Sequence, residues 1–247
     1  MRIGFLSDIH GNREALDACL AHGARTGIDR WVFLGDLVGY GADPQYVVDC
    51  VVRHMETGAL ALLGNHDQAV VDGLAEGMNE YARAAIEWTA RQLDPAAAAL
   101  IRSLPMSILE DDRLYVHSEA HSPKSWNYVT EILGAERSMN ATEARVTLCG
   151  HVHRPQLYYM SRTKPPGYFL PQAGTGIPLI GRRKWLAVLG SVGQPRDRNP
   201  AAAYAILDTD RNEIAYQRTP YNVEKAAAKI HAAGLPQMLA ARLFIGR

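Results

Sequence analysis

The chain has 247 residues, of which 47% are apolar and 21% charged, as in ordinary soluble globular proteins. Its 26 basic residues balance its 26 acidic ones, so no global field attracts nucleic acid or an anionic membrane. The three cysteines are scattered, which excludes a disulfide framework and a zinc ribbon and fits a reducing compartment. We expect a single domain over residues 1–247.

Apolar runs such as residues 96–101 and 185–189 fall far short of the ~20 residues that span a bilayer. No signal peptide is expected before the first strand, so we expect a cytoplasmic protein without a membrane partner. Binding of nucleic acid would require a local basic groove, which the balanced composition disfavours without excluding it.

In the first third of the chain, β-like runs alternate with amphipathic helical stretches, which indicates βαβ units and a largely parallel sheet. Strands are predicted over residues 2–7, 30–34 and 59–63. Asn12 is expected to cap a helix that closes at Gly27, and Asp43 with Pro44 to begin a second one.

The remainder of the chain divides into a helical part and a strand-rich part. One helical region runs through residues 81–93, and a helix from Asp94 ends before Pro105. A hairpin of residues 106–109 and 113–116 and a strand over residues 145–149 come next. Further short strands predict an antiparallel meander that forms a second sheet: residues 157–160, 168–169, 177–180, 185–189, 203–207 and 213–217. Asn222 should cap a helix over residues 223–233, and Pro236 should open a last short one.

Polar residues with metal-binding side chains follow five predicted strands at the point where each ends. They are Asp8 and His10, Asp36, Asn65 to Asp67, His117, and His151 with His153. In open α/β sheets ligands bind at the carboxyl ends of the strands, so these endings are expected to converge in one crevice. An isolated Asp-x-His more often marks a strand end that turns polar where it reaches the protein surface. In an extended chain, however, residues i and i+2 lie on the same face, so Asp8 and His10 would project together. The fivefold repetition therefore favours a site.

The side chains in these endings offer oxygen and imidazole nitrogen but no thiolate. This mixture suits Mn, Fe, Zn, Ni or Co, and it contains too much histidine for Ca or Mg alone. Six or seven ligands exceed the need of one ion that also binds substrate. Two divalent metal ions bridged by a carboxylate are the simplest arrangement.

The blocks Asp-x-His, Gly-Asp, Gly-Asn-His-Asp, His and Gly-His-x-His occur in this order between Asp8 and His153. In this the sequence resembles the calcineurin-like metallophosphoesterases, and residues 39–41 and 190–197 resemble a small bacterial and archaeal branch. The resemblance implies a four-layer α/β/β/α sandwich with two mixed sheets. It also implies a phosphohydrolase that cleaves phosphomonoesters or phosphodiesters by attack of a metal-bridging hydroxide, with Mn or Fe as the favoured ions.

The resemblance also implies a role for each block. Two sets of ligands result: Asp8, His10 and His153 for one ion, and Asn65, His117 and His151 for the other, with Asp36 as the bridge. His66 would protonate the leaving-group oxygen, since a histidine pKa lies near neutrality. Asp67 would orient the His66 ring.

Two departures from the pattern leave alternatives open. The Gly-Asp block continues as residues 37–41 without the Asp-Arg-Gly of serine/threonine protein phosphatases and symmetric diadenosine tetraphosphate hydrolases, so a phosphate-binding arginine is missing there. His117 is followed by Ser118, where relatives often carry Gly. A protein phosphatase or nucleoside polyphosphate hydrolase is the second hypothesis, and a non-catalytic binding scaffold on the same fold is the third. The natural substrate and the oligomeric state stay open.

Several other polar residues near the blocks receive no role. His121 either lines the pocket or faces solvent. Contact with a substrate phosphate is conceivable for four residues: Arg13, Tyr40, Arg154 and Arg196. The simpler interpretation is that each is a solvated loop residue or covers apolar surface with the aliphatic or aromatic part of its side chain.

Overall fold

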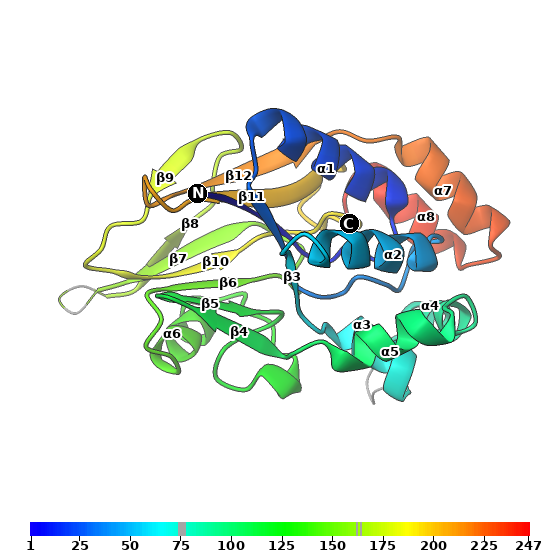
Figure 1. The fold of residues 1–247 in the computed structure, drawn as a ribbon, viewed down its shortest axis with the longest axis horizontal. Coiled ribbons are helices and arrows are strands. Elements are labelled where there is room, and N and C mark those ends of the chain that lie inside the picture. Colours follow the sequence, from blue (N-terminus) through cyan, green and yellow to red (C-terminus); the bar gives the residue numbers. More distant parts are fainter. Residues whose placement is uncertain (74–77, 162, 164) are drawn as a thin grey trace.

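Two six-stranded sheets lie against each other in the computed structural model, which describes residues 1–73, 78–161, 163 and 165–247 (Figure 1). The first sheet has the strand order β3 (Leu60–Ala61), β2 (Arg30–Phe33), β1 (Arg2–Leu6), β11 (Ala202–Asp208), β12 (Glu213–Thr219) and β9 (Gly176–Pro178). The second has the order β4 (Ser107–Glu110), β5 (Arg113–Val116), β6 (Val146–Cys149), β10 (Lys184–Val188), β7 (Gln156–Met160) and β8 (Gly167–Phe169).

Both sheets are mixed. In the first, β1, β2 and β3 are parallel and the rest antiparallel. In the second, β5, β6 and β10 are parallel and the rest antiparallel. The prediction that the later strands form a second sheet of their own is therefore wrong. Strands β9, β11 and β12 extend the first sheet, and β7, β8 and β10 complete the second. An alternating strand pattern fixes which face is buried, but it does not specify the partner strand.

A continuous apolar layer fills the space between the sheets. Ile3 and Phe5 of β1 face it, whereas Leu6 faces the helices, as expected from the alternation of side chains along a strand. The Phe5 and Tyr115 rings meet edge to face with centroids 5.2 Å apart. Full burial of such a side chain contributes about 1.5–3 kcal/mol to folding.

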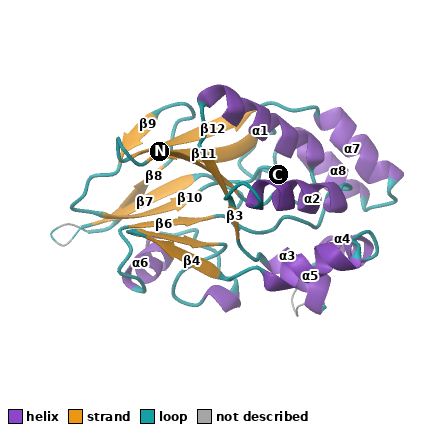
Figure 2. Ribbon diagram, in the orientation of Figure 1, coloured by secondary structure: helices purple, strands orange, loops and turns teal. Residues whose placement is uncertain are grey.

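Helices cover the outer faces of both sheets and give the four layers that the resemblance implied (Figure 2). The outer face of the first sheet packs against α1 (Arg13–Thr26), α2 (Pro44–Met55) and α5 (Pro95–Ser103). The outer face of the second packs against α6 (Ile132–Asn140). A further apolar cluster joins α4 (Glu80–Ala90), α7 (Val223–Ala232) and α8 (Gln237–Ile245). No helix in the described ranges is both long and apolar enough to cross a membrane.

The predicted helix caps are confirmed at three positions and are wrong at one. Side-chain oxygens of Asn12, Asp94 and Asn222 accept hydrogen bonds from the backbone three residues on, at 3.1, 2.7 and 2.8 Å. Asp43 makes no such bond; its carboxylate accepts from the Lys229 ammonium at 2.7 Å instead. A helix that the sequence did not predict, α3 (Asn65–Asp72), begins directly at the third polar block.

Candidate metal centre

The five polar blocks lie together where the parallel strands of the two sheets end. β1, β2 and β3 supply three blocks from the first sheet, and β5 and β6 supply two from the second. The site is therefore built at the seam between the sheets. The exposed fraction of six of its side chains is at most 4%: Asp8, His10, Asp36, His117, His151 and His153.

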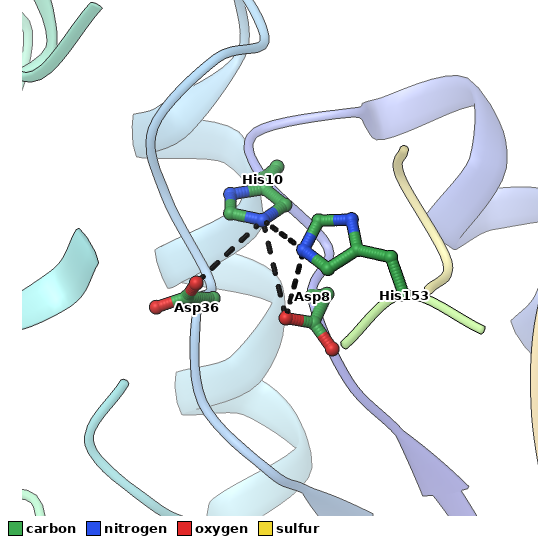
Figure 3. A group of neighbouring side chains, drawn as sticks. All are labelled: Asp8, His10, Asp36 and His153. Carbon is green, nitrogen blue, oxygen red and sulfur yellow. Dashed lines mark hydrogen bonds and ion pairs between the residues drawn. The ribbon is translucent and has the colours of Figure 1, made fainter. Parts of the chain in front are cut away.

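One group of donor atoms comprises Asp8, His10, Asp36 and His153, all within 4.8 Å of one another (Figure 3). Nε2 of His153 lies 3.2 Å from Nε2 of His10 and 3.2 Å from Oδ1 of Asp8. Nε2 of His10 lies 3.6 Å from Oδ2 of Asp36. Imidazole nitrogens and carboxylate oxygens thus surround one small volume.

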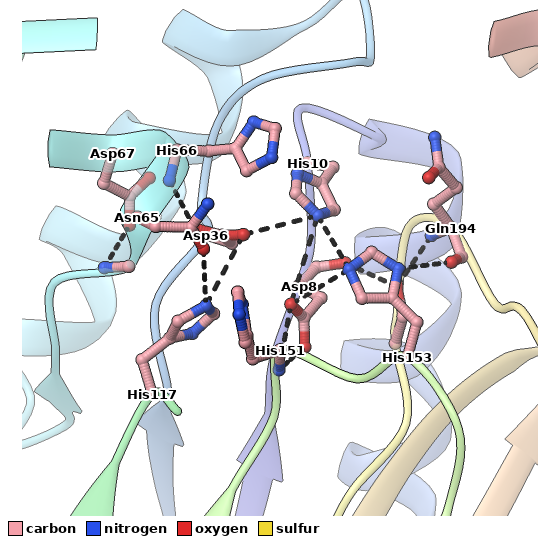
Figure 4. A network of polar contacts seen from close by, with 12 residues as sticks. Asp8, His10, Asp36, Asn65, His66, Asp67, His117, His151, His153 and Gln194 are labelled. Carbon is pink, nitrogen blue, oxygen red and sulfur yellow. Dashed lines mark hydrogen bonds and ion pairs between the residues drawn. The ribbon is translucent and has the colours of Figure 1, made fainter. Parts of the chain in front are cut away.

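A second group comprises Asp36, His117 and His151 (Figure 4). Oδ2 of Asp36 lies 3.5 Å from Nε2 of His117, and Oδ1 of Asn65 lies 3.2 Å from the same nitrogen. The other oxygen of Asp36 accepts the backbone N–H of His66 at 2.8 Å. Asp36 therefore belongs to both groups and offers them the same oxygen.

The donor set fits divalent ions because the second nitrogen of each ring is already used. Nδ1 of His10, His117 and His153 lies 3.1, 2.7 and 2.6 Å from the carbonyl oxygens of Val38, Leu34 and Gln194, respectively. A proton on Nδ1 leaves the Nε2 lone pair free and directed at the other donors. His151 is reversed: its Nε2 donates to the carbonyl of Trp126 at 2.8 Å, which leaves Nδ1 for a metal.

Burial and mutual charge set the protonation of the site. Burial lowers the pKa of His151 to about 3, and it also lowers the pKa of His10 and of His153. Burial alone would raise the pKa of Asp36, but His117 and His66 hold it well below its usual value. Burial opposes charge on His117, yet Asp36 and Asp8 raise its pKa to about 9. His10, His151 and His153 are therefore neutral at pH 7, as ligands must be, whereas a metal ion on His117 would displace its second proton.

The backbone at the site is not extended, which corrects the strand argument for Asp8 and His10. β1 ends at Leu6, and Asp8 and His10 have φ of 54° and 50°, in the left-handed region. His151 and His153 repeat this with φ of 65° and 60°. The paired side chains converge through these turns rather than through the shared face of a strand.

Two glycines allow the loops to approach one another. A Cβ on Gly64 would lie 2.1 Å from the backbone nitrogen of Asp36, and one on Gly150 would lie 1.8 Å from Oγ of Ser7. No larger residue fits either position without movement of the backbone.

His66 occupies the first turn of α3, beside the first group of donors (Figure 4). Its ring centroid lies 4.8 Å from that of His10 and 4.5 Å from that of Tyr40, and burial lowers its pKa to about 4. Asp67 does not orient this ring, contrary to expectation. Its oxygens accept the backbone N–H groups of Val38 and Gly64, each at 3.1 Å. Asp67 therefore fixes the loops and leaves Nδ1 of His66 without a hydrogen-bond partner in the described structure.

The residues that received no role from the sequence divide into those that lie away from the metal centre and those that border it. His121 is exposed, and Arg154 is exposed with Nε bound to the carbonyl of Arg196 at 2.9 Å. Arg13 pairs with Asp17 and lies over the Tyr46 ring, 4.0 Å from its centroid. Tyr40 and Arg196, in contrast, border the metal centre.

Several residues that support the site were not assigned a role from the sequence. The carbonyls of Gln194 and Trp126 orient His153 and His151. Oγ of Ser191 donates to the carbonyl of Asp8 at 2.8 Å, and Tyr128 stacks on the His151 ring at 4.1 Å. Most of these contacts use the backbone, so residue type gives little signal. The one available pointer was the segment 190–197, which resembles one branch of a known family.

The sequence and the fold are both similar to those of known proteins. The pattern of the calcineurin-like phosphoesterase superfamily domain matches residues 1–212. An uncharacterised protein of Methanocaldococcus jannaschii is 34% identical over 99% of this chain and 98% of its own length. The crystal structure of a metallophosphoesterase from Sphaerobacter thermophilus superposes with a TM-score of 0.88 at 32% identity, covering 100% of this chain and 99% of that one. A hypothetical protein of Pyrococcus horikoshii shares the fold, with a TM-score of 0.80 at 18% identity over 100% and 98% of the two chains. The chain belongs to the calcineurin-like phosphoesterase superfamily.

Proposed function

We propose that the protein is a phosphohydrolase that uses two divalent metal ions to cleave phosphomonoesters or phosphodiesters. The observation that carries the proposal is the position of Asp36, whose Oδ2 lies within 3.6 Å of His10 and 3.5 Å of His117, one from each donor group. When bound, two such ions supply Lewis acidity, which makes water nucleophilic at neutral pH and stabilises charge on phosphoryl oxygens.

The chain's own residues divide the remaining work. Asp8, His10 and His153 would hold one ion and Asn65, His117 and His151 the other, with Asp36 offering the same oxygen to both groups. The carbonyls that accept from the outer ring nitrogens keep each imidazole in the tautomer and orientation that binding requires. Asp67 keeps the loop after β2 against the start of α3.

His66 is the proton donor to the leaving group in this proposal. Its ring lies beside His10 at the edge of the first donor group. Burial keeps the ring neutral at pH 7 without substrate, since its pKa is about 4. A bound phosphate brings negative charge next to the ring, which favours the protonated form and allows it to donate to the departing oxygen.

A non-catalytic scaffold is a weaker explanation because every donor in the two groups is buried and oriented. A protein phosphatase or nucleoside polyphosphate hydrolase is compatible with the same centre, and phosphopeptides and dinucleotides in a substrate panel would distinguish them.

The decisive experiment loads the purified protein with Mn, Fe, Zn, Ni or Co and measures hydrolysis of p-nitrophenyl phosphate and its bis ester. We expect activity with at least one metal and a loss of about 100-fold or more in Asp36→Asn, together with reduced metal content. Asp17→Asn, at an exposed aspartate on α1, is the matched control and should behave as wild type. Full activity in Asp36→Asn, or no activity with any metal, would refute the proposal.

A further inference from the structure

Two arginines beside the metal centre lack a negatively charged partner. Nε and Nη2 of Arg196 donate to Oε1 of Gln194 at 3.3 and 2.9 Å. Nη1 of Arg242 donates to the same oxygen at 3.2 Å, and its buried Nε has no hydrogen-bond partner in the described structure. Neither guanidinium lies within ion-pair distance of a carboxylate of the described residues.

This arrangement differs from that of other partly buried arginines in the chain. Arg30, Arg145 and Arg218 each pair with a carboxylate, on Glu110, Asp112 and Asp197, respectively. A guanidinium that is partly removed from water without such a partner is costly unless another anion satisfies it. Arg196 and Arg242 share one neutral amide oxygen, so their charges remain available to a ligand.

The position of Arg196 directs that charge at the metal centre. Its backbone N–H donates to the carbonyl of His153 at 3.0 Å, so the residue is tied to a proposed metal ligand. Its guanidinium carbon lies 5.8 Å from the centroid of the Tyr40 ring, which in turn contacts both His10 and His66.

Tyr128 marks the side from which a ligand can enter. Its ring stacks on His151 with an interplanar angle of 15°, yet 55% of the residue is exposed. Arg196, which is itself only partly buried, lies over the buried tyrosine at the first donor group, and Tyr128 stacks on the second from the solvent side. An anion at the metal centre would meet this guanidinium on the solvent side.

We propose that Arg196 binds a phosphoryl oxygen of the substrate at the metal centre, held in position by Gln194, and that it gives the enzyme a preference for phosphomonoesters over phosphodiesters. The inference rests on the proposed phosphohydrolase function. Arg196 comes from the loop after β10 and would replace the arginine that is missing after Asp36.

The preference follows from the number of charged oxygens. A diester has only two oxygens that are not esterified, and two bound divalent ions would engage both of them. A monoester has a third, which the forked guanidinium can bind. Two divalent ions would also bring four positive charges against the two carboxylates Asp8 and Asp36, and Arg196 adds a further one. Such a site favours the more highly charged monoester.

The test compares p-nitrophenyl phosphate with bis(p-nitrophenyl) phosphate, which have the same leaving group. For Arg196→Ala we expect kcat/KM for the monoester to fall about 10- to 100-fold, mainly through KM, and that for the diester to fall less than about 3-fold. Arg196→Lys should recover part of the monoester activity because it keeps the charge but loses the fork. Arg13→Ala is the matched control, because this arginine also lies over a tyrosine ring but already pairs with Asp17.

Calorimetric titration of inorganic phosphate into the metal-loaded protein gives a second measurement that does not require turnover. The dissociation constant should rise about 10- to 100-fold in Arg196→Ala and stay unchanged in Arg13→Ala. Unchanged phosphate binding, or equal losses on the two esters, would overturn the inference even if the wild type is active. Should the wild type hydrolyse neither ester, the proposed function fails, and Arg196-dependent phosphate binding would still support the phosphate contact.

Discussion

Individual residues at the centre adopt a backbone conformation that most side chains avoid. Asp8, His10, Asp36, His151 and His153 all have φ between 50° and 65°. Each such residue costs of order 1–3 kcal/mol and persists only where its surroundings fix it. Here the loops fix one another: the N–H of Asp8 donates to the carbonyl of Gly35 at 3.1 Å, and that of His10 to the carbonyl of Asp36 at 2.9 Å. Backbone hydrogen bonds between the loops thus hold the donors in position.

Loss of the His66 imidazole should slow the departure of poor leaving groups most. In His66→Gln we expect kcat for phenyl phosphate to fall roughly 100-fold or more, because a phenolate of high pKa needs a proton as it departs. With p-nitrophenyl phosphate, whose leaving group is stable without one, the loss should stay below about 10-fold.

Metal content, measured by elemental analysis, should be unchanged in this variant, since His66 belongs to neither donor group. His22→Gln, at a histidine on α1 that bonds to Tyr204, is the control and should not change either rate. Equal losses on the two substrates would argue against proton donation by His66.

The sequence predicted residue roles unevenly. The buried aspartates and histidines of the two groups were all proposed from it, because metal-binding side chains at five strand endings form a recognisable pattern. Gln194 and Trp126 were missed because they act through carbonyl oxygens, which every residue possesses. Asp67 was misjudged because its position next to His66 in the chain suggested a contact that the turn of α3 does not allow.

Helices around the centre are connected by an ion-pair network around the buried carboxylate of Glu14. Nζ of Lys229 on α7 lies 2.8 Å from Glu14 at the start of α1 and 2.7 Å from Asp43, which precedes α2. Glu14 is almost fully buried, and Lys225 also reaches it, at 3.2 Å. The network therefore secures the first turns of the two helices that follow the Asp8–His10 and Asp36 loops.

Removal of this lysine should destabilise the fold in a pH-dependent way. Lys229→Met should lower the free energy of unfolding by about 1–3 kcal/mol at pH 7, because it leaves the buried Glu14 carboxylate without its closest partner. Burial raises the pKa of Glu14, but Lys229 and Lys225 bring it below the ordinary value of 4.5. A carboxylate whose pKa is lowered by folding stabilises the protein at pH values above its unfolded pKa. This contribution is lost as the pH falls through the folded pKa.

The difference between wild type and Lys229→Met, measured by urea unfolding, should thus shrink as the pH is lowered below 4.5. Lys225→Met removes a lysine that is 59% exposed and should cost less. A difference that is constant from pH 7 to the acid range would contradict the role of Glu14.

Elements were predicted more accurately than their pairing. The strand and helix boundaries came close to those observed because apolar periodicity, Pro, Gly and capping residues act locally. The distribution of the last six strands over two sheets depends on contacts between distant segments, such as β1 with β11, which no local pattern records. The family resemblance, rather than periodicity, supplied the correct layers.

At the scale of the whole molecule, the metal centre joins the two sheets. Asp8, His10 and Asp36 follow strands of the first sheet, and His117, His151 and His153 follow strands of the second. Ions held by both sets would bind the folded protein and not the unfolded chain. They should therefore stabilise it by mass action, by about 2.7 kcal/mol at 100 times the dissociation constant.

Chelation by EDTA should accordingly lower the melting temperature by about 5–10 °C, and excess Mn should restore it. Differential scanning calorimetry of the stripped and reloaded protein measures this shift. The shift should be much smaller in Asp36→Asn, which lacks the shared oxygen. Identical melting temperatures with and without metal would show that the ions do not join the sheets.

The shared carboxylate of Asp36 also has an evolutionary consequence. It is the single residue common to the two donor groups, and the turn that carries it has no room for a methyl group on Gly64. The spacing of the two groups is thus fixed by one side chain, whereas each group taken alone is held by its own loops. A descendant that lost this aspartate would keep both sets of loops but, like Asp36→Asn, would bind less metal, so the two groups are expected to be lost or retained together.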